Sequence, residues 1–191
     1  MSKGRLEAFS DGVIAIIITI MVLEVRPPAG TRIEDLLPLG PTLLSYLLSF
    51  ALLGSYWSNH HHMLQAARTV DGRALWANLH LLFWLSLFPF GTAWMGEHDF
   101  APIPVATYGV LMVLAALAYY GLARALMAVP GQPRTLADAI GRDVKGKVSP
   151  VLFAVAIPIA LVAPVISMAI YGGVVVMWLV PDRRIERAIG E

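Results

Sequence analysis

No cysteine occurs among the 191 residues of this sequence, and charged residues are scarce. Without thiols the chain can form neither a disulfide framework nor a thiolate metal site. Charged residues make up 14% of the chain, whereas a soluble domain carries roughly a quarter. The net charge of +1 gives no indication of a nucleic-acid partner. A Gly-x-Ser-x-Gly elbow is also absent, which argues against a hydrolase, and we predict that the protein is not an enzyme.

Apolar residues are abundant instead. They make up 58% of the chain, and the mean hydropathy is +0.69. The charged residues are confined to short clusters between long apolar runs, which is the pattern of helices that cross a bilayer. We therefore predict an all-α integral membrane protein in which residues 1–191 form a single transmembrane domain.

The apolar runs predict six transmembrane helices. Their expected positions are about 6–25, after Pro41 to about 63, 74–95, 103–122, and two helices within 148–180. The last run would measure about 50 Å as one helix, against a hydrocarbon core of ~30 Å. It should form a hairpin that breaks near 162–164, because Pro164 disfavours helix in the preceding residue. Pro89 predicts a kink in the third helix, and the polar stretch 132–147 predicts a short amphipathic helix.

The basic residues predict the orientation of these helices. With six spans, twelve of the 14 lysines and arginines fall on one side of the membrane, and the side richer in these residues is cytoplasmic. The twelve are Lys3, Arg5, Arg68, Arg73, Arg124, Arg134, Arg142, Lys145, Lys147, Arg183, Arg184 and Arg187. Only Arg26 and Arg32 fall on the other side. We therefore predict a multi-pass protein of the cell membrane with both termini in the cytoplasm.

Few polar side chains fall at membrane depth, and each is a candidate site because its burial in lipid is costly. They are Asp11, Asn59, His60, His61, His62, Asn78 and His80. Consecutive helical residues point ~100° apart, so the three adjacent histidines cannot share one metal ion. We predict neither a metal site nor a resident cofactor. The absence of an arginine ladder and of a Thr-Val-Gly-Tyr-Gly loop argues against a voltage sensor and a carbonyl-lined potassium filter.

The first helix has one apolar face. With Ile16 as the reference, Thr19 and Leu23 lie within about 60° of it around the helix axis. This stripe either faces lipid, with the Thr19 hydroxyl bonded to the carbonyl of Ala15, or lines a pore. Rotation or tilt of the helix would place Ile17, Ile18 or Ile20 on the axis instead.

Ser10 and Asp11 point away from the apolar face of the first helix. A carboxylate inside a helix bundle requires partners, so we expect these two residues to bond to the second and third helices. The candidate partners are Asn59, His60 and Asn78, with the indole of Trp57 as a further donor.

The first helix carries the sequence Arg5-x-x-x-Phe9-Ser10-Asp11, which resembles the signature of the transmembrane protein 175 family of potassium channels. Further matches are Trp57, Asn59-His60-His61, Asn78, Phe88-Pro89-Phe90 and the tail 178–184. The resemblance covers essentially the whole chain. Family members carry either one or two six-helix repeats, and the single repeat here implies a homotetramer.

The resemblance also implies the position of the pore. First helices from four subunits would surround a path for potassium, the permeant ion. Ile16 and Leu23 would form apolar rings that narrow this path, with Thr19 as a hydroxyl ring between them. Arg5, Phe9, Ser10, Asp11, Trp57, Asn59, His60 and Asn78 would form the motif and the network between helices.

Two other classes of function remain open from the sequence. A proton-coupled transporter would use Asp11 and His60 as a relay, although the chain lacks the paired broken helices of inverted repeats. A non-conducting structural membrane protein is the second alternative. Ion flux through liposomes would separate these two from a passive channel.

Overall fold

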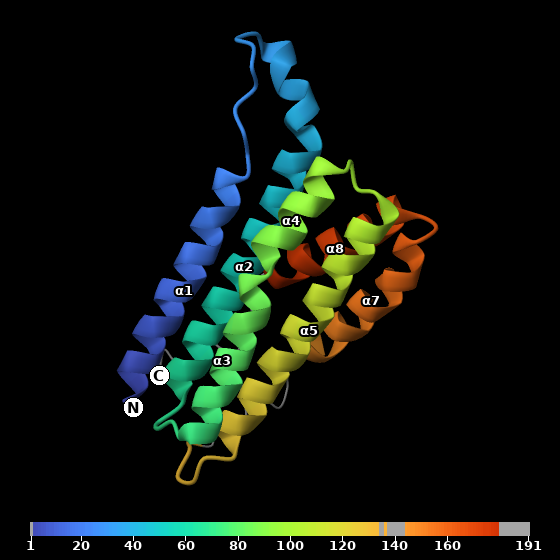
Figure 1. Ribbon diagram of the computed structural model, residues 1–191. Coiled ribbons are helices and arrows are strands. Elements are labelled where there is room, and N and C mark those ends of the chain that lie inside the picture. Colours follow the sequence, from blue (N-terminus) through green and yellow to red (C-terminus); the bar gives the residue numbers. More distant parts are fainter. Residues whose placement is uncertain (1, 134–135, 137–143, 180–191) are drawn as a thin grey trace.

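The computed structural model describes residues 2–133, 136 and 144–179, and within these residues it contains helices and loops without a strand. The elements are α1 (Lys3–Leu23), the 3₁₀ helix η1 (Ile33–Leu39), α2 (Gly40–Ala66), α3 (Gly72–Ser86), α4 (Phe88–Glu97), α5 (Pro102–Met127), α7 (Val144–Ala160) and α8 (Pro164–Leu179). The fold is therefore all-α, as the sequence predicts (Figure 1).

Four helical segments within the described ranges are long and apolar enough to cross a membrane. They are α1, η1 continued by α2, α3 continued by α4, and α5. Helices α7 and α8 have 17 and 16 residues, which corresponds to about 25 Å at the helical rise of ~1.5 Å per residue. They form a short hairpin that completes the predicted six helices.

Prolines and one aspartate fix where the helices begin. Helices α2, α4 and α5 carry proline in their first two positions, and α8 begins at Pro164. Proline suits this place because the first helical N–H groups have no partner within the helix. Asp71 caps α3 by accepting a hydrogen bond from the backbone N–H of Ala74 at 2.9 Å.

The two predicted interruptions are confirmed. Helix α3 ends at Ser86 and α4 begins at Phe88, because Pro89 has no N–H for the carbonyl of the residue four positions earlier. Helix α7 ends at Ala160 before α8 begins at Pro164. The amphipathic helix predicted for 132–147 lies largely outside the described residues, and its last part belongs to α7.

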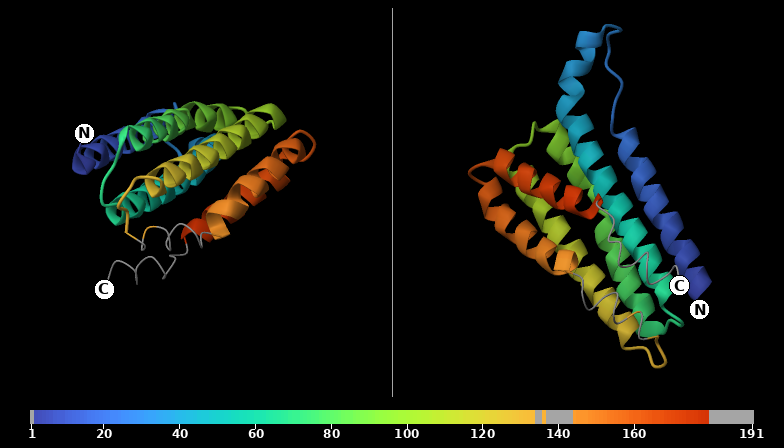
Figure 2. Two further views of the ribbon diagram at one scale, coloured as in Figure 1. Left: turned by 90° about the horizontal axis from the view of Figure 1, so that it is seen from below. Right: turned by 180° about the vertical axis from the view of Figure 1, so that it is seen from behind.

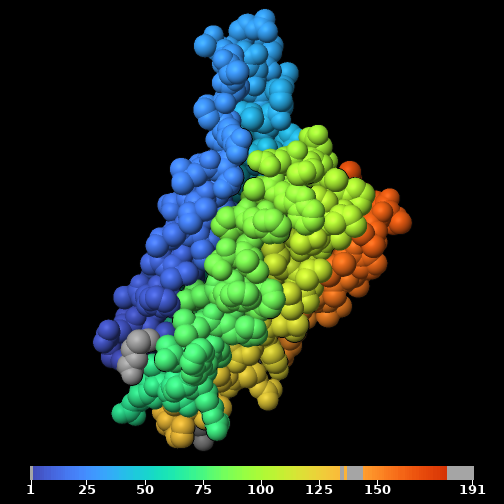
Figure 3. Space-filling model, viewed as in Figure 1, coloured from blue at the N-terminus to red at the C-terminus, as the bar shows by residue number. Residues whose placement is uncertain are grey.

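The helices are arranged with α1 along one edge of the bundle and the α7–α8 hairpin along the opposite edge (Figures 1 and 2). Helices α2 to α5 fill the space between these edges. The tip formed by η1 and the start of α2 projects beyond the other helices (Figure 3). Helix α1 therefore has one side against its own subunit and one side turned outward.

Small residues allow close approach in the interior, as is common between membrane helices. A Cβ atom at Gly109 of α5 would collide with the hydroxyl of Tyr171 from α8. A Cβ atom at Gly96 of α4 would likewise meet the hydroxyl of Ser45 on α2. These two glycines thus set the contacts that α5 and α4 make with their neighbours.

Candidate functional site

Helix α1 has a buried side and an exposed side. Leu6, Ser10, Ile14, Ile17 and Met21 are at most 4% exposed and pack inside the subunit. From Ala8 to Leu23 the exposed side is apolar apart from the hydroxyl group of Thr19. It includes Phe9, Gly12, Ile16, Ile20 and Leu23. A second protein surface or lipid must cover this side in the membrane.

The residues expected at a pore lie on this exposed side. Ile16 is 58% exposed and Leu23 is 76% exposed, and Thr19 is exposed between them. Of the rival positions, Ile17 is buried, Ile18 packs against the core, and Ile20 lies on the exposed side at 41%.

The Thr19 hydroxyl donates to the backbone carbonyl of Ile16 at 2.9 Å. The expectation that it bonds to Ala15 is therefore wrong. A threonine side chain can reach the carbonyl either three or four residues earlier, and Thr19 bonds to the carbonyl three residues earlier. The hydroxyl oxygen keeps its lone pairs as acceptors on the exposed side.

A directed chain of hydrogen bonds lies behind the exposed side. His60 of α2 and the side-chain carbonyl of Asn78 on α3 are 2.7 Å apart. The amide nitrogen of Asn78 donates to the hydroxyl of Ser10 at 2.9 Å, and Ser10 donates to the carbonyl of Leu6 at 2.9 Å. Since the Asn78 carbonyl can only accept, Nε2 of His60 is the donor. Three fully buried side chains thus join α1, α2 and α3.

A second contact joins α1 to α2 nearer the surface. The indole nitrogen of Trp57 donates to Oδ1 of Asp11 at 2.9 Å. The Trp57 ring stacks on His61 of the next helical turn, with ring centroids 5.9 Å apart. The carboxylate of Asp11 is therefore bonded to a side chain of the same subunit and turned away from the exposed side of α1.

Lys3 adds a third contact between these helices, which sequence reasoning missed. Its ammonium group donates to the carbonyls of Gln65 and Ala67 at 3.1 and 2.9 Å. Glu7 lies 3.8 Å from the same ammonium group. The last carbonyls of a helix have no partner within it, so the Lys3 cation stabilises the end of α2.

The other expected network residues lie elsewhere. The Asn59 amide donates to the carbonyl of Ser55 in its own helix at 2.7 Å and faces a cavity on the far side of α2 from α1. The expectation that Asn59 joins the network is wrong, because adjacent helical residues point ~100° apart and its neighbour His60 takes the inward position. Arg5 and Phe9 are exposed on α1.

The remaining motif residues are distributed along the chain. Phe88 and Pro89 lie at the break between α3 and α4. The indole of Trp178 donates to the hydroxyl of Ser149 at 2.9 Å. Residues 180–184 of the tail motif lie outside the described part of the chain.

A buried hydroxyl cluster was missed by the sequence reasoning. Ser49 of α2 lies 2.6 Å from the hydroxyl of Thr92 on α4 and 2.7 Å from that of Tyr108 on α5. Each residue is at most 4% exposed. The available signal was the presence of hydroxyl residues in three apolar runs, but α2 and α5 each carry several of them, and the register between helices was needed to show which ones meet.

This chain is similar in sequence and in structure to several known proteins. The family described as "Endosomal/lysosomal potassium channel TMEM175" matches residues 5–89, the stretch that carries Ser10, His60 and Asn78. A protein of Chryseobacterium sp. (strain P1-3) named as a potassium channel is 47% identical over 191 residues, covering 100% of both chains.

Two further relatives share a smaller part of the sequence. The crystal structure of a lysosomal potassium-selective channel TMEM175 homolog from Chamaesiphon minutus has a TM-score of 0.80 and 30% identity, covering 93% of this chain and 96% of that one. The human endosomal/lysosomal proton channel TMEM175 is 35% identical over 86 residues, which are 37% of this chain and 17% of that protein. The chain therefore belongs to the TMEM175 family of multi-pass membrane channels.

Proposed function

We propose that this protein is a potassium-permeable channel in which four identical subunits surround a pore lined by α1. The observation that carries the proposal is the apolar outer side of α1, on which Ile16 and Leu23 are largely exposed in the single subunit. The potassium channels among the relatives support the permeant ion. Fourfold assembly would bury this side against copies of itself around a central axis.

The spacing of the exposed residues suits a stack of rings. Ile16 and Leu23 are seven residues apart, so their rings would be separated by about 10 Å along the axis. Apolar rings of this kind can close a pore by expelling water. The Thr19 ring lies between them, and its hydroxyl oxygens would replace part of the hydration shell of a potassium ion. Flux through such a pore is passive.

The basic residues at one end of the bundle support a cytoplasmic position for both termini. The start of α1, the end of α2, the start of α3 and the end of α5 lie together at that end (Figure 1). Lys3, Arg73 and Arg124 belong to these helices and Arg68 follows α2, whereas Arg26 and Arg32 follow α1 at the opposite end. An excess of basic residues favours the cytoplasmic side, which fits a protein of the cell membrane.

The geometry gives little support to a relay between Asp11 and His60. Asp11 accepts from Trp57, whereas His60 bonds to Asn78. These are separate contacts, so a proton has no continuous path between the two residues through the side chains described.

Reconstitution into liposomes tests the proposed function. Potassium should move down its gradient whether or not a proton gradient is present, and the purified assembly should have the mass of four subunits in nanodiscs. Flux that requires a proton gradient would favour the transporter. An absence of flux from correctly assembled protein would favour the non-conducting alternative.

A further inference from the structure

Among the side chains that the structure describes, two buried polar atoms have no hydrogen-bond partner. They are Oε1 of Glu7 on α1 and Nδ1 of His60 on α2. Such atoms are rare in native proteins, and each requires an explanation. Both can accept a hydrogen bond. A carboxylate has only acceptors, and the neutral ring of His60 uses its Nε2–H on Asn78, which leaves a lone pair on Nδ1.

The two atoms lie at a similar height along the contact between α1 and α2. The register of these antiparallel helices is fixed by two contacts, between Lys3 and Gln65 and between Asp11 and Trp57. Glu7 is the midpoint of the two α1 residues, and residue 61 is the midpoint of the two α2 residues. Glu7 therefore lies level with the helical turn that carries His60. Its carboxylate is also near enough for its charge to act on the His60 ring.

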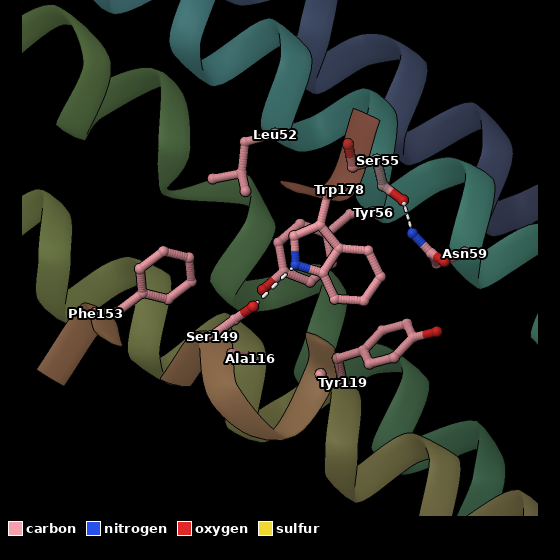
Figure 4. A pocket seen from close by; sticks show the side chains of 10 residues that line it. Leu52, Ser55, Tyr56, Asn59, Ala116, Tyr119, Ser149, Phe153 and Trp178 are labelled. Carbon is pink, nitrogen blue, oxygen red and sulfur yellow. Dashed lines mark hydrogen bonds between the residues drawn. The ribbon is translucent and has the colours of Figure 1, made fainter. Parts of the chain in front are cut away.

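The hydrogen-bond donors nearby are engaged elsewhere. The ammonium group of Lys3 lies 3.8 Å from Oε1 of Glu7, which is too far for a hydrogen bond, and it donates to backbone carbonyls at the end of α2. Asn59, the residue before His60, is turned to a cavity on the other side of α2, where its amide donates to the carbonyl of Ser55 (Figure 4). The partner of the two acceptors therefore comes from outside the described side chains.

The chemistry of the two acceptors selects water as this partner. Two neighbouring acceptors need a molecule with two donors, and buried waters commonly bridge polar groups of this kind. The Lys3 ammonium already lies beside the Glu7 carboxylate, so a neutral molecule suffices. A metal ion would need more ligands, and the described part of the chain contains no group of three or more His, Asp or Glu side chains that could hold one.

We infer that one water molecule is bound between α1 and α2, where it donates to Oε1 of Glu7 and to Nδ1 of His60. The side chain of Glu7 is 24% exposed, so water can enter from the surface of the subunit. The bound water joins Glu7 to the buried chain of His60, Asn78 and Ser10. It thus holds α1 against α2 between the Lys3 and Asp11 contacts. The site lies within one subunit and does not depend on the proposed pore.

Solid-state NMR of the full-length assembly in lipid at neutral pH tests the site. His60 becomes the single histidine of the chain when the other four are replaced by glutamine, namely His61, His62, His80 and His98. With isotope-labelled histidine, the ring should show a protonated Nε2 and an unprotonated Nδ1 that accepts a hydrogen bond. It should also receive magnetisation from water. A protonated Nδ1, or a ring without contact to water, would overturn the inference.

Two further variants locate the water in the same labelled chain. Glu7→Met removes the carboxylate at similar side-chain length and leaves the water with fewer partners than a buried water requires, so the contact between water and the His60 ring should be lost. Glu97→Met at the end of α4 is the matched control and should retain the contact. An equally strong water contact in both variants would mean that Glu7 does not bind the water.

A high-resolution crystal structure of the wild-type assembly decides if these variants do not assemble. An electron-density peak within hydrogen-bond distance of both Oε1 of Glu7 and Nδ1 of His60 is the expected result. Direct contact between the two side chains, without a peak between them, would show that a shared proton takes the place of the water and would overturn the inference.

Discussion

Asn78 of α3 donates a hydrogen bond to the hydroxyl of Ser10 on α1 over 2.9 Å, and both side chains are fully buried. The same amide accepts from His60, so Asn78 joins three helices. A substitution that removes the amide leaves the Nε2–H of His60 without its acceptor, whereas the Ser10 hydroxyl loses a donor but keeps its bond to the carbonyl of Leu6. This contact therefore provides a direct test of how α1 is held in place.

Asn78→Leu should lower the free energy of unfolding by about 1–3 kcal/mol, the cost of the one buried N–H group of His60 that is left unsatisfied. Thermal unfolding of the purified assembly in mild detergent measures the effect. Ser86→Ala is the control, since the exposed hydroxyl of Ser86 bonds only to the carbonyl of Phe83. Similar melting temperatures for both variants would contradict the role assigned to Asn78.

Asp11→Ala should impair folding or assembly more than it changes ion preference. The substitution removes the acceptor of the Trp57 indole without altering the exposed side of α1. Trp57→Phe removes the donor and should give a similar loss of assembly in nanodisc mass measurements. Normal assembly of Asp11→Ala with a changed potassium-to-sodium flux ratio would place Asp11 in the ion pathway.

Ile16→Asn should raise potassium conductance and reduce discrimination against sodium. The substitution makes an apolar ring wettable and thus lowers the barrier that dewetting creates. Single-channel recording measures both effects. Leu117→Asn on the exposed side of α5 is the control and should leave conductance unchanged. Ile17→Asn should instead destabilise the subunit, because Ile17 is buried. An increase in conductance with Ile17→Asn alone would mean that the opposite side of α1 lines the pore.

Thr19→Val should reduce the preference for potassium and leave assembly intact. It removes the hydroxyl at nearly constant volume, and the hydrogen bond that is lost is exposed and lies within one helix. Thr19→Ser retains the hydroxyl and should retain the preference. The measurement is the reversal potential under potassium and sodium gradients. Equal reversal potentials for Thr19→Val and the wild-type protein would exclude Thr19 from selectivity.

Gly109→Ala should destabilise the subunit by about 1–3 kcal/mol, the usual cost of overpacking. The added methyl group would collide with the hydroxyl of Tyr171. Gly121→Ala in the same helix is the matched control, because a Cβ atom there meets no atom within 4 Å. Gly121→Ala should be neutral or stabilising, since alanine favours helix over glycine by about 1 kcal/mol. A melting temperature for Gly109→Ala equal to that of the control would mean that Tyr171 moves aside without cost.

The sequence predicted features that depend on local chemistry. Proline placed the break between α3 and α4 and the start of α8, because a missing N–H interrupts a helix whatever surrounds it. Helical periodicity also placed Ser10 and Ile16 on different sides of α1, whereas the choice of the pore-facing side came from the family resemblance. These features require no knowledge of neighbouring helices.

Features that depend on the register between helices could not be predicted in the same way. Asn59 and His60 are both polar and adjacent, and only the position of α3 decides that His60 takes the inward place opposite Asn78. The cluster of Ser49, Thr92 and Tyr108 likewise requires three helices at fixed heights. A hydroxyl can also bond to its own helix, so the sequence leaves both outcomes open.

The short α7–α8 hairpin has a consequence for the host membrane. Helix α1 has 21 residues and would span about 32 Å, close to the ~30 Å of a typical hydrocarbon core. The hairpin, at about 25 Å, falls short by about 5 Å. Lipid beside it must compress, at a fraction of a kcal/mol for each ångström of mismatch. Lipids with long acyl chains should therefore strain the region around the α7–α8 hairpin, while α1 still matches the bilayer. A change in bilayer thickness should thus affect the hairpin before it affects α1.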